Sequence, residues 1–149
     1  MGSAQIVVPD WVAPARIQVQ DLHTAATAQA HRSELARGCL DAIDWIVDPA
    51  GPTSEQAQAE AAATGKHKDP YHRGISDTLA WLCGWLPDPW HLEIPRRNPD
   101  GSLPTADQIY AEILDTRYSH WAGAHTPEQR DEARHEADAA AYRWARVFG

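Results

Sequence analysis

The chain contains only one phenylalanine, one methionine and two cysteines in 149 residues. Cys39 and Cys83 form no CxxC pair, so a thiolate-bound metal is not indicated and both are expected to be reduced thiols. No apolar run approaches the roughly 20 residues that a membrane span needs. The first residues also lack the basic start and long apolar stretch of a secretory signal. These absences predict a soluble, cytoplasmic protein without membrane association.

Positive charge is also scarce, because 13 Lys and Arg face 21 Asp and Glu, for a net charge of -8. Direct binding to a nucleic-acid backbone needs clustered basic residues and is not expected. An acidic protein suits neutral or basic partners. An acidic inhibitor that imitates nucleic acid, and so binds a nucleic-acid-handling protein, is one alternative function.

The motifs of the common catalytic sites are missing. The chain contains no GxSxG nucleophile elbow, no phosphate-binding glycine loop, no HExxH zinc motif and no GxGxxG. Both cysteines lie in predicted helices among apolar neighbours, where a buried thiol is unreactive. We therefore expect no cofactor and favour a non-catalytic function over an enzyme.

Helix start signals are what the sequence does contain. Three segments share the pattern Thr-x-acid-Gln, at 53–56, 105–108 and 126–129. Each is a capping box, in which the Thr hydroxyl and the Gln side chain accept reciprocal backbone hydrogen bonds. They predict helices over about 53–64, 105–121 and 126–149.

Two further helices are predicted over about 22–47 and 71–86, each ended by a proline. Asp21 is a candidate N-cap for the first. Residues 1–20 contain the β-like runs 6–8 and 17–19 and are interpreted as an extended arm with a short β element. The sequence thus predicts an all-α bundle of four to five helices, with residues 21–149 forming one domain.

These two helices carry one motif twice, RGCLDAIDWI from Arg37 and RGISDTLAWL from Arg73. A mid-helix glycine costs about 1 kcal/mol relative to alanine, so Gly38 and Gly74 favour close approach of another backbone. The Trp of each copy is expected to fill the space beside the crossing. We therefore predict a pseudo-two-fold helix pair, and the alternative interpretation is a shared binding groove between the helices.

Histidine is frequent, with eight residues. The best candidate metal ligands are His67, Asp69 and His72, which offer two imidazoles and a carboxylate within six positions. Lys66 and Lys68 stand beside them and would repel a cation, so a solvated loop is the alternative interpretation.

The last predicted helix carries carboxylates at helical spacing. These carboxylates are Glu128, Asp131, Glu132, Glu136 and Asp138, and His135 lies among them. Such an array can bind magnesium when a second helix supplies matching acids, and the first long helix offers Glu34, Asp41 and Asp44. Arginines interleave with these acids, which favours a solvated ion-paired face. A metal-dependent all-α hydrolase is the second alternative function.

Seven tryptophans are present, and several have no place in the predicted core. Trp85, Trp90 and His91 fall at a helix end and in a proline-rich loop, and Trp11 lies at a bend. Exposed aromatics beside rigid prolines are typical anchors for protein contacts, although this segment could instead fold over the core. The leading hypothesis is a regulator, inhibitor or assembly factor that binds another protein through these residues. Self-association stays open.

Overall fold

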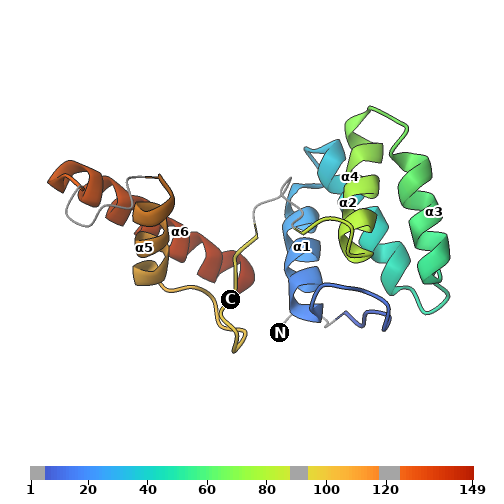
Figure 1. Cartoon of the computed structure of the whole chain (residues 1–149), viewed down its shortest axis with the longest axis horizontal. Coiled ribbons are helices and arrows are strands. Elements are labelled where there is room, and N and C mark those ends of the chain that lie inside the picture. Colours follow the sequence, from blue (N-terminus) through green and yellow to red (C-terminus); the bar gives the residue numbers. More distant parts are fainter. Residues whose placement is uncertain (1–5, 88–93, 118–124) are drawn as a thin grey trace. The chain divides into compact units, whose positions relative to one another are not determined.

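The computed structural model describes residues 6–87, 94–117 and 125–149 (Figure 1). Its six helices are α1 (Arg16–Gln29), α2 (Glu34–Val47), α3 (Ser54–Thr64), α4 (Pro70–Leu82), α5 (Ala106–Arg117) and α6 (Pro127–Phe148). The all-α prediction is confirmed, since these described ranges contain no strand. Nor do they contain a helix long and apolar enough to cross a membrane.

The chain divides into two compact units, residues 1–94 and 95–149, which are described separately here. Unit 1 contains α1 to α4, and unit 2 contains α5 and α6. The single domain expected over 21–149 stays a prediction.

All three predicted capping boxes are present. The hydroxyls of Thr53, Thr105 and Thr126 each accept from the backbone N–H of the glutamine three residues later, at 3.1–3.2 Å. The same glutamine side chains accept from the three Thr N–H groups at 2.8–2.9 Å. These helix starts were predictable because both partners of each bond lie within four residues.

The predicted helix over 22–47 is wrong, because the segment forms two helices. α1 ends at Gln29, and Ser33 begins α2 by accepting from the Ala36 N–H at 3.2 Å. The β-like interpretation of 17–19 is also wrong. These residues lie in the first turn of α1, where the Gln18 side chain accepts from the Ala15 N–H at 2.9 Å. Asp21 is buried inside α1 and is therefore not its N-cap.

The split reveals two helical hairpins, α1–α2 and α3–α4, joined at their second helices. α2 packs against α4, α1 against α2, and α3 against α4. Figure 1 shows α2 and α4 together at the centre of unit 1, with α1 and α3 on either side. The repeat that the sequence indicated within two helices therefore extends to two hairpins.

The hairpins cross at the two motif glycines, as predicted. A Cβ atom on Gly38 would lie 2.1 Å from the carbonyl oxygen of Tyr71 and 3.1 Å from the nitrogen of Ile75. A Cβ atom on Gly74 would lie 2.2 Å from the carbonyl oxygen of Leu35 and 3.1 Å from the nitrogen of Cys39. Tyr71 follows Leu35, and Ile75 follows Cys39, by the same 36 residues that separate the glycines. The contacts are reciprocal, so the pair is pseudo-two-fold symmetric.

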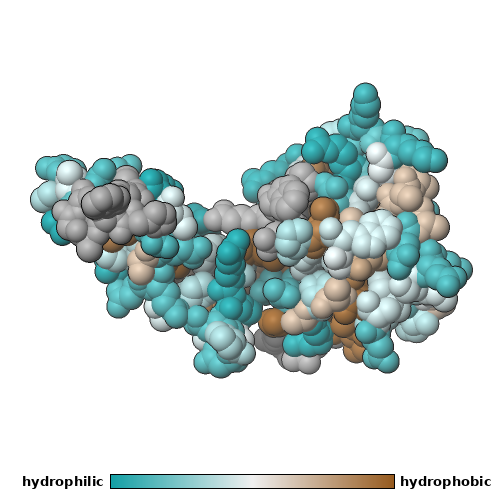
Figure 2. Space-filling view, in the orientation of Figure 1, coloured by the Kyte–Doolittle hydropathy of each residue, from teal (hydrophilic) through white to brown (hydrophobic). Residues whose placement is uncertain are grey.

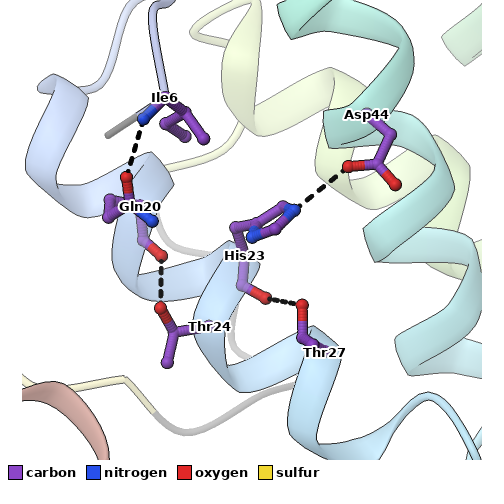
Figure 3. Close-up of polar contacts among 6 residues, drawn as sticks. All are labelled: Ile6, Gln20, His23, Thr24, Thr27 and Asp44. Carbon is purple, nitrogen blue, oxygen red and sulfur yellow. Dashed lines mark hydrogen bonds and ion pairs between the residues drawn. The ribbon is translucent and has the colours of Figure 1, made fainter. Parts of the chain in front are cut away.

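The N-terminal segment 6–15 bridges α1 and the end of α4. The Ile6 N–H donates to the Gln20 side chain at 2.9 Å (Figure 3), and the Ala13 N–H donates to the Leu82 carbonyl at 2.8 Å. Figure 3 also shows His23 of α1 turned toward Asp44 of α2, with 3.0 Å between His23 Nε2 and Asp44 Oδ1. These contacts fix the segment and α1 to the α2–α4 pair.

α4 ends at Leu82 rather than at Leu86, and Gly84 is the reason. Gly84 adopts φ +84°, a left-handed conformation that terminates helices and favours glycine. Its N–H donates to the Trp81 carbonyl at 3.0 Å, and the Trp85 N–H donates to the Ala80 carbonyl at 2.8 Å. This pair of bonds is the Schellman motif, and it places Trp85 just beyond the helix.

Unit 2 is a small amphipathic pair. Its core consists of Ile109, Ala137 and Ala140, against which Tyr110, Ile113, Ala141 and Trp144 pack. The buried face of α6 consists of Ala133, Ala137 and Ala140. The small alanines let α5 approach α6 closely.

Candidate functional site

The two motif tryptophans occupy different environments. Trp81 is 4% exposed and belongs to the core of unit 1, whereas Trp45 is 38% exposed. The prediction that both fill space beside the crossing is confirmed for Trp81 only. Trp45 instead leaves part of its ring on the surface, where it lines a cleft.

The cleft lies between α2, α3 and α4 and has a volume of about 360 Å³. Its walls are Asp41, Ala42, Trp45, Glu60, Tyr71 and Ile75. The face of unit 1 in Figure 2 is largely hydrophilic, with hydrophobic side chains interspersed. A cleft that combines two aromatic rings with two carboxylates is therefore a distinctive feature of this unit.

One side-chain hydrogen bond joins α2 to α4 at the cleft. The Tyr71 hydroxyl of α4 donates to Asp41 Oδ2 of α2 at 2.7 Å. This bond raises the pKa of the Tyr71 phenol, because the bond and the negative charge of Asp41 both disfavour the phenolate. Tyr71 thus stays a neutral hydrogen-bond donor.

The nearby cation Arg37 is turned toward its own hairpin. Its charge acts on Tyr71, but its guanidinium donates to the Ala30 carbonyl at 3.4 Å. Asp41 instead has its hydrogen-bond partner on the other helix, in Tyr71. The cleft therefore offers carboxylate and aromatic groups to a ligand.

Of the four predicted partner-binding residues, the structure describes two. Trp85 is 53% exposed and Trp11 is half-buried. A Cβ atom on Gly84 would lie 3.3 Å from the Cβ atom of Ala13. The segments that carry Trp11 and Trp85 therefore lie close together near the end of α4. Trp90 and His91 lie outside the described residues. A partner site at these four positions stays a prediction.

The alternative metal ligands His67, Asp69 and His72 do come together at the start of α4. Their ligand atoms all lie within 4.8 Å of one another, which is the geometry that the sequence spacing suggested. Asp69 is the N-cap of α4, and its carboxylate accepts from the His72 N–H at 3.1 Å. That backbone bond, with a second from the His72 ring, lowers the pKa of Asp69.

Two carboxylates of the last helix, Glu136 and Asp138, form ion pairs with arginines, and Arg134 of this helix also pairs with Asp107 of α5. Glu136 pairs with Arg117 of α5 through both oxygens, and Arg134 pairs with Asp107 at 2.9 Å. The Arg117 bonds hold the pKa of Glu136 below its ordinary value. Arg134 also lies over the Tyr110 ring, 4.2 Å from its centroid. These contacts fit the ion-paired face that the interleaved arginines indicated.

Neither cysteine is activated as a nucleophile. Burial raises the pKa of the Cys39 thiol, which donates a long hydrogen bond of 3.7 Å to the Gly74 carbonyl. Burial also raises the pKa of Cys83. A raised pKa keeps both side chains as thiols near neutral pH.

The sequence offered a shared groove between the two motif helices as an alternative interpretation, but it did not identify the residues that line this cleft. It named Asp41 as a candidate metal ligand and Trp45 as packing, and it did not consider Glu60, Tyr71 or Ile75. The repeat itself contained a signal, since Tyr71 stands where the first copy has Leu35. Glu60 could not have been found, because its place depends on how α3 packs.

Comparisons with protein-family models, curated proteins and solved structures find no family, protein or fold that matches the chain.

Proposed function

We propose that this chain is a non-catalytic cytoplasmic protein that binds another protein by accepting a lysine or arginine side chain in the α2–α3–α4 cleft. The observation that carries the proposal is the lining of the cleft, with Trp45 and Tyr71 beside Asp41 and Glu60. Aromatic faces attract a cation through their quadrupole. Carboxylates add direct charge attraction and hydrogen-bond acceptors.

The charges around the cleft support a cationic ligand over an anionic or apolar one. Asp41 and Glu60 place two exposed carboxyl groups at the cleft. The net charge of -8 adds long-range attraction for a basic segment. An apolar ligand would cover carboxylate oxygens of the cleft without supplying hydrogen-bond donors to them, which is costly.

The aromatic groups are held in place before a ligand arrives. Tyr71 is fixed by its bond to Asp41, and α2 and α4 are locked together at Gly38 and Gly74. A preformed site loses less conformational entropy on binding than a flexible one. The rigid crossing is therefore a suitable base for a recognition cleft.

The test is an NMR titration of the full chain with an acetylated, amidated tripeptide that carries lysine at its centre. We expect the Trp45 indole resonance to shift with a dissociation constant on the order of 1 mM, which corresponds to roughly 4 kcal/mol. The shift should weaken as salt is added, because the carboxylates are exposed. The same tripeptide with glutamine at its centre is the matched ligand control.

Three variants separate the cleft from the predicted contact at Trp85. Trp45→Ala removes the aromatic wall, and Asp41→Asn removes the charge while it keeps an oxygen acceptor for Tyr71. Both should abolish the lysine-dependent shifts of the Tyr71 ring, which lines the same cleft and is present in both variants. Trp85→Ala should leave them unchanged. Equal shifts with the glutamine peptide would refute cation recognition, and loss of binding in Trp85→Ala alone would move the site to the end of α4.

A further inference from the structure

The segment between α3 and α4 gathers three metal-ligating side chains. His67 follows the C-cap of α3, Asp69 caps α4, and His72 lies in the first turn of α4. The rings of His67 and His72 stack with their centroids 4.3 Å apart. His72 Nδ1 lies 2.7–2.8 Å from the two Asp69 carboxylate oxygens. Two histidines and one carboxylate therefore converge from six residues of chain.

Backbone structure sets this convergence. The Asp69 carboxylate is held by the His72 N–H, so the cap that starts α4 also positions a ligand oxygen. Because α4 begins at Pro70, the His72 ring projects from a fixed turn and lies beside the cap. Of the three, only His67 lies before the N-cap of α4, and its side chain is exposed. To bind a metal ion, only the His67 side chain would have to move toward the other two ligands.

The distances suit a small divalent ion. In a tetrahedral zinc site with bonds of about 2.0 Å, ligand atoms lie roughly 3.3 Å apart. The three donors here lie within 4.8 Å of one another, and the Asp69–His72 pair is already closer than 3 Å. Rotation of the exposed His67 ring can supply the remaining closure. The fourth position would be open to water or to a group from another molecule.

The chemistry of the donors selects the metal class. Two imidazoles and one carboxylate suit zinc and the neighbouring late transition metals, whereas calcium and magnesium prefer sites made of oxygen alone. Lys66 and Lys68 and the positive end of the α4 dipole oppose a cation. The carboxylate of Asp69 offsets part of this opposing charge.

We propose that His67, Asp69 and His72 bind one zinc-type divalent ion, which fixes the α3–α4 connection to the start of α4. The ion would replace the hydrogen bond between Asp69 and the His72 ring, and it leaves the backbone cap in place. Tyr71 directly precedes His72 in the chain, and the two rings meet edge-on with their centroids 5.4 Å apart. The metal site thus adjoins the cleft but uses none of its walls.

The experiment is calorimetric titration of zinc chloride into the full chain, free of any histidine tag and first stripped of metal. We expect one equivalent to bind, and His67→Ala and Asp69→Asn each to weaken binding by at least about tenfold. Asparagine still caps a helix, so Asp69→Asn keeps α4 intact. His31→Ala, which removes an exposed histidine in the α1–α2 connection, is the matched control and should bind as the wild type does.

Cobalt(II) supplies a second measurement, because its visible absorption reports the number and kind of ligands. We expect a low-coordinate spectrum in the wild type and in His31→Ala that is lost in His67→Ala. Absence of zinc binding by the wild type would overturn the proposal, as would wild-type binding in both ligand variants. Tighter binding of magnesium than of zinc would overturn the assigned metal class. None of these outcomes depends on lysine binding in the cleft.

Discussion

The α1–α2 and α3–α4 hairpins pack in the same way at the helix crossing, but the tryptophans at equivalent positions differ in exposure. A Cβ atom would lie 2.1 Å from the Tyr71 carbonyl oxygen if placed on Gly38, and 2.2 Å from the Leu35 carbonyl oxygen if placed on Gly74, so the packing is nearly symmetric. The tryptophans that follow them are 38% and 4% exposed, and Tyr71 replaces the Leu35 of the first copy. The symmetric positions hold the fold together, and the positions that break the symmetry line the cleft.

The N-terminal segment offers a physical reason for the difference. It bonds to α1 through Gln20 and to α4 through Leu82, the residue after Trp81. On the α3 side, no described segment beyond the three helices contributes to the walls of the cleft. One tryptophan of the repeat is therefore part of the core, and the other is available to a ligand.

The largest expected effect is the loss of Trp81. Trp81→Ala removes a buried ring and should lower the free energy of unfolding by about 3–5 kcal/mol. Trp45→Ala removes a ring that is already partly solvated, so its cost should be about 1–2 kcal/mol. Urea unfolding followed by circular dichroism measures both. Equal losses of unfolding free energy in the two variants would show that Trp81 and Trp45 do not differ in burial.

An intermediate effect is expected at the crossing. Gly38→Ala and Gly74→Ala each force a methyl group into backbone atoms and should cost about 1–3 kcal/mol. Because the contacts are reciprocal, the two losses should agree to within about 0.5 kcal/mol. Gly65→Ala is the control, since its Cβ would meet nothing nearer than 3.1 Å. Clearly unequal losses at the two motif glycines would refute the symmetric crossing.

The smallest effect is a difference in thiol reactivity. Cys39 lies at the crossing and Cys83 at the end of α4, and burial raises the pKa of both above the ordinary 9.0. Alkylation should therefore continue to accelerate as the pH rises beyond that value, with Cys39 the slower because it is more buried. Mass spectrometry of iodoacetamide-treated protein gives the two rates. Gly38→Ala should speed Cys39 more than Cys83, and a faster Cys39 in the wild type would contradict its placement.

Local patterns predicted the helix starts and the glycine crossing. Thr126 and Gln129 form a reciprocal bond within one turn, so sequence alone suffices there. The break before α2 was missed, although Ser33 followed by Glu34 is a weak start signal. Val19 was assigned to a β-like run because β-branched residues favour strands. Its burial in α1 is a tertiary effect that outweighs this preference.

The two candidate sites also differ in whether the sequence alone could predict them. His67, Asp69 and His72 are close in sequence, so their spacing could indicate the cluster that the structure shows. The cleft joins Asp41, Glu60 and Tyr71 from three helices, and its assembly depends on the packing of α3 and α4. Residues that meet only through such packing have no shared sequence pattern to detect.

The most direct test of the account is an intermolecular NOE experiment on the full chain with the lysine-centred tripeptide. The account predicts contacts from the lysine side-chain methylene protons to the rings of Trp45 and Tyr71, and none to Trp81. These contacts should vanish in Trp45→Ala, while Trp85→Ala should retain those to Tyr71 and Trp45. Contacts to Trp85 in place of the cleft rings, or none to any ring, would contradict the claim that the broken symmetry of the repeat forms a binding site.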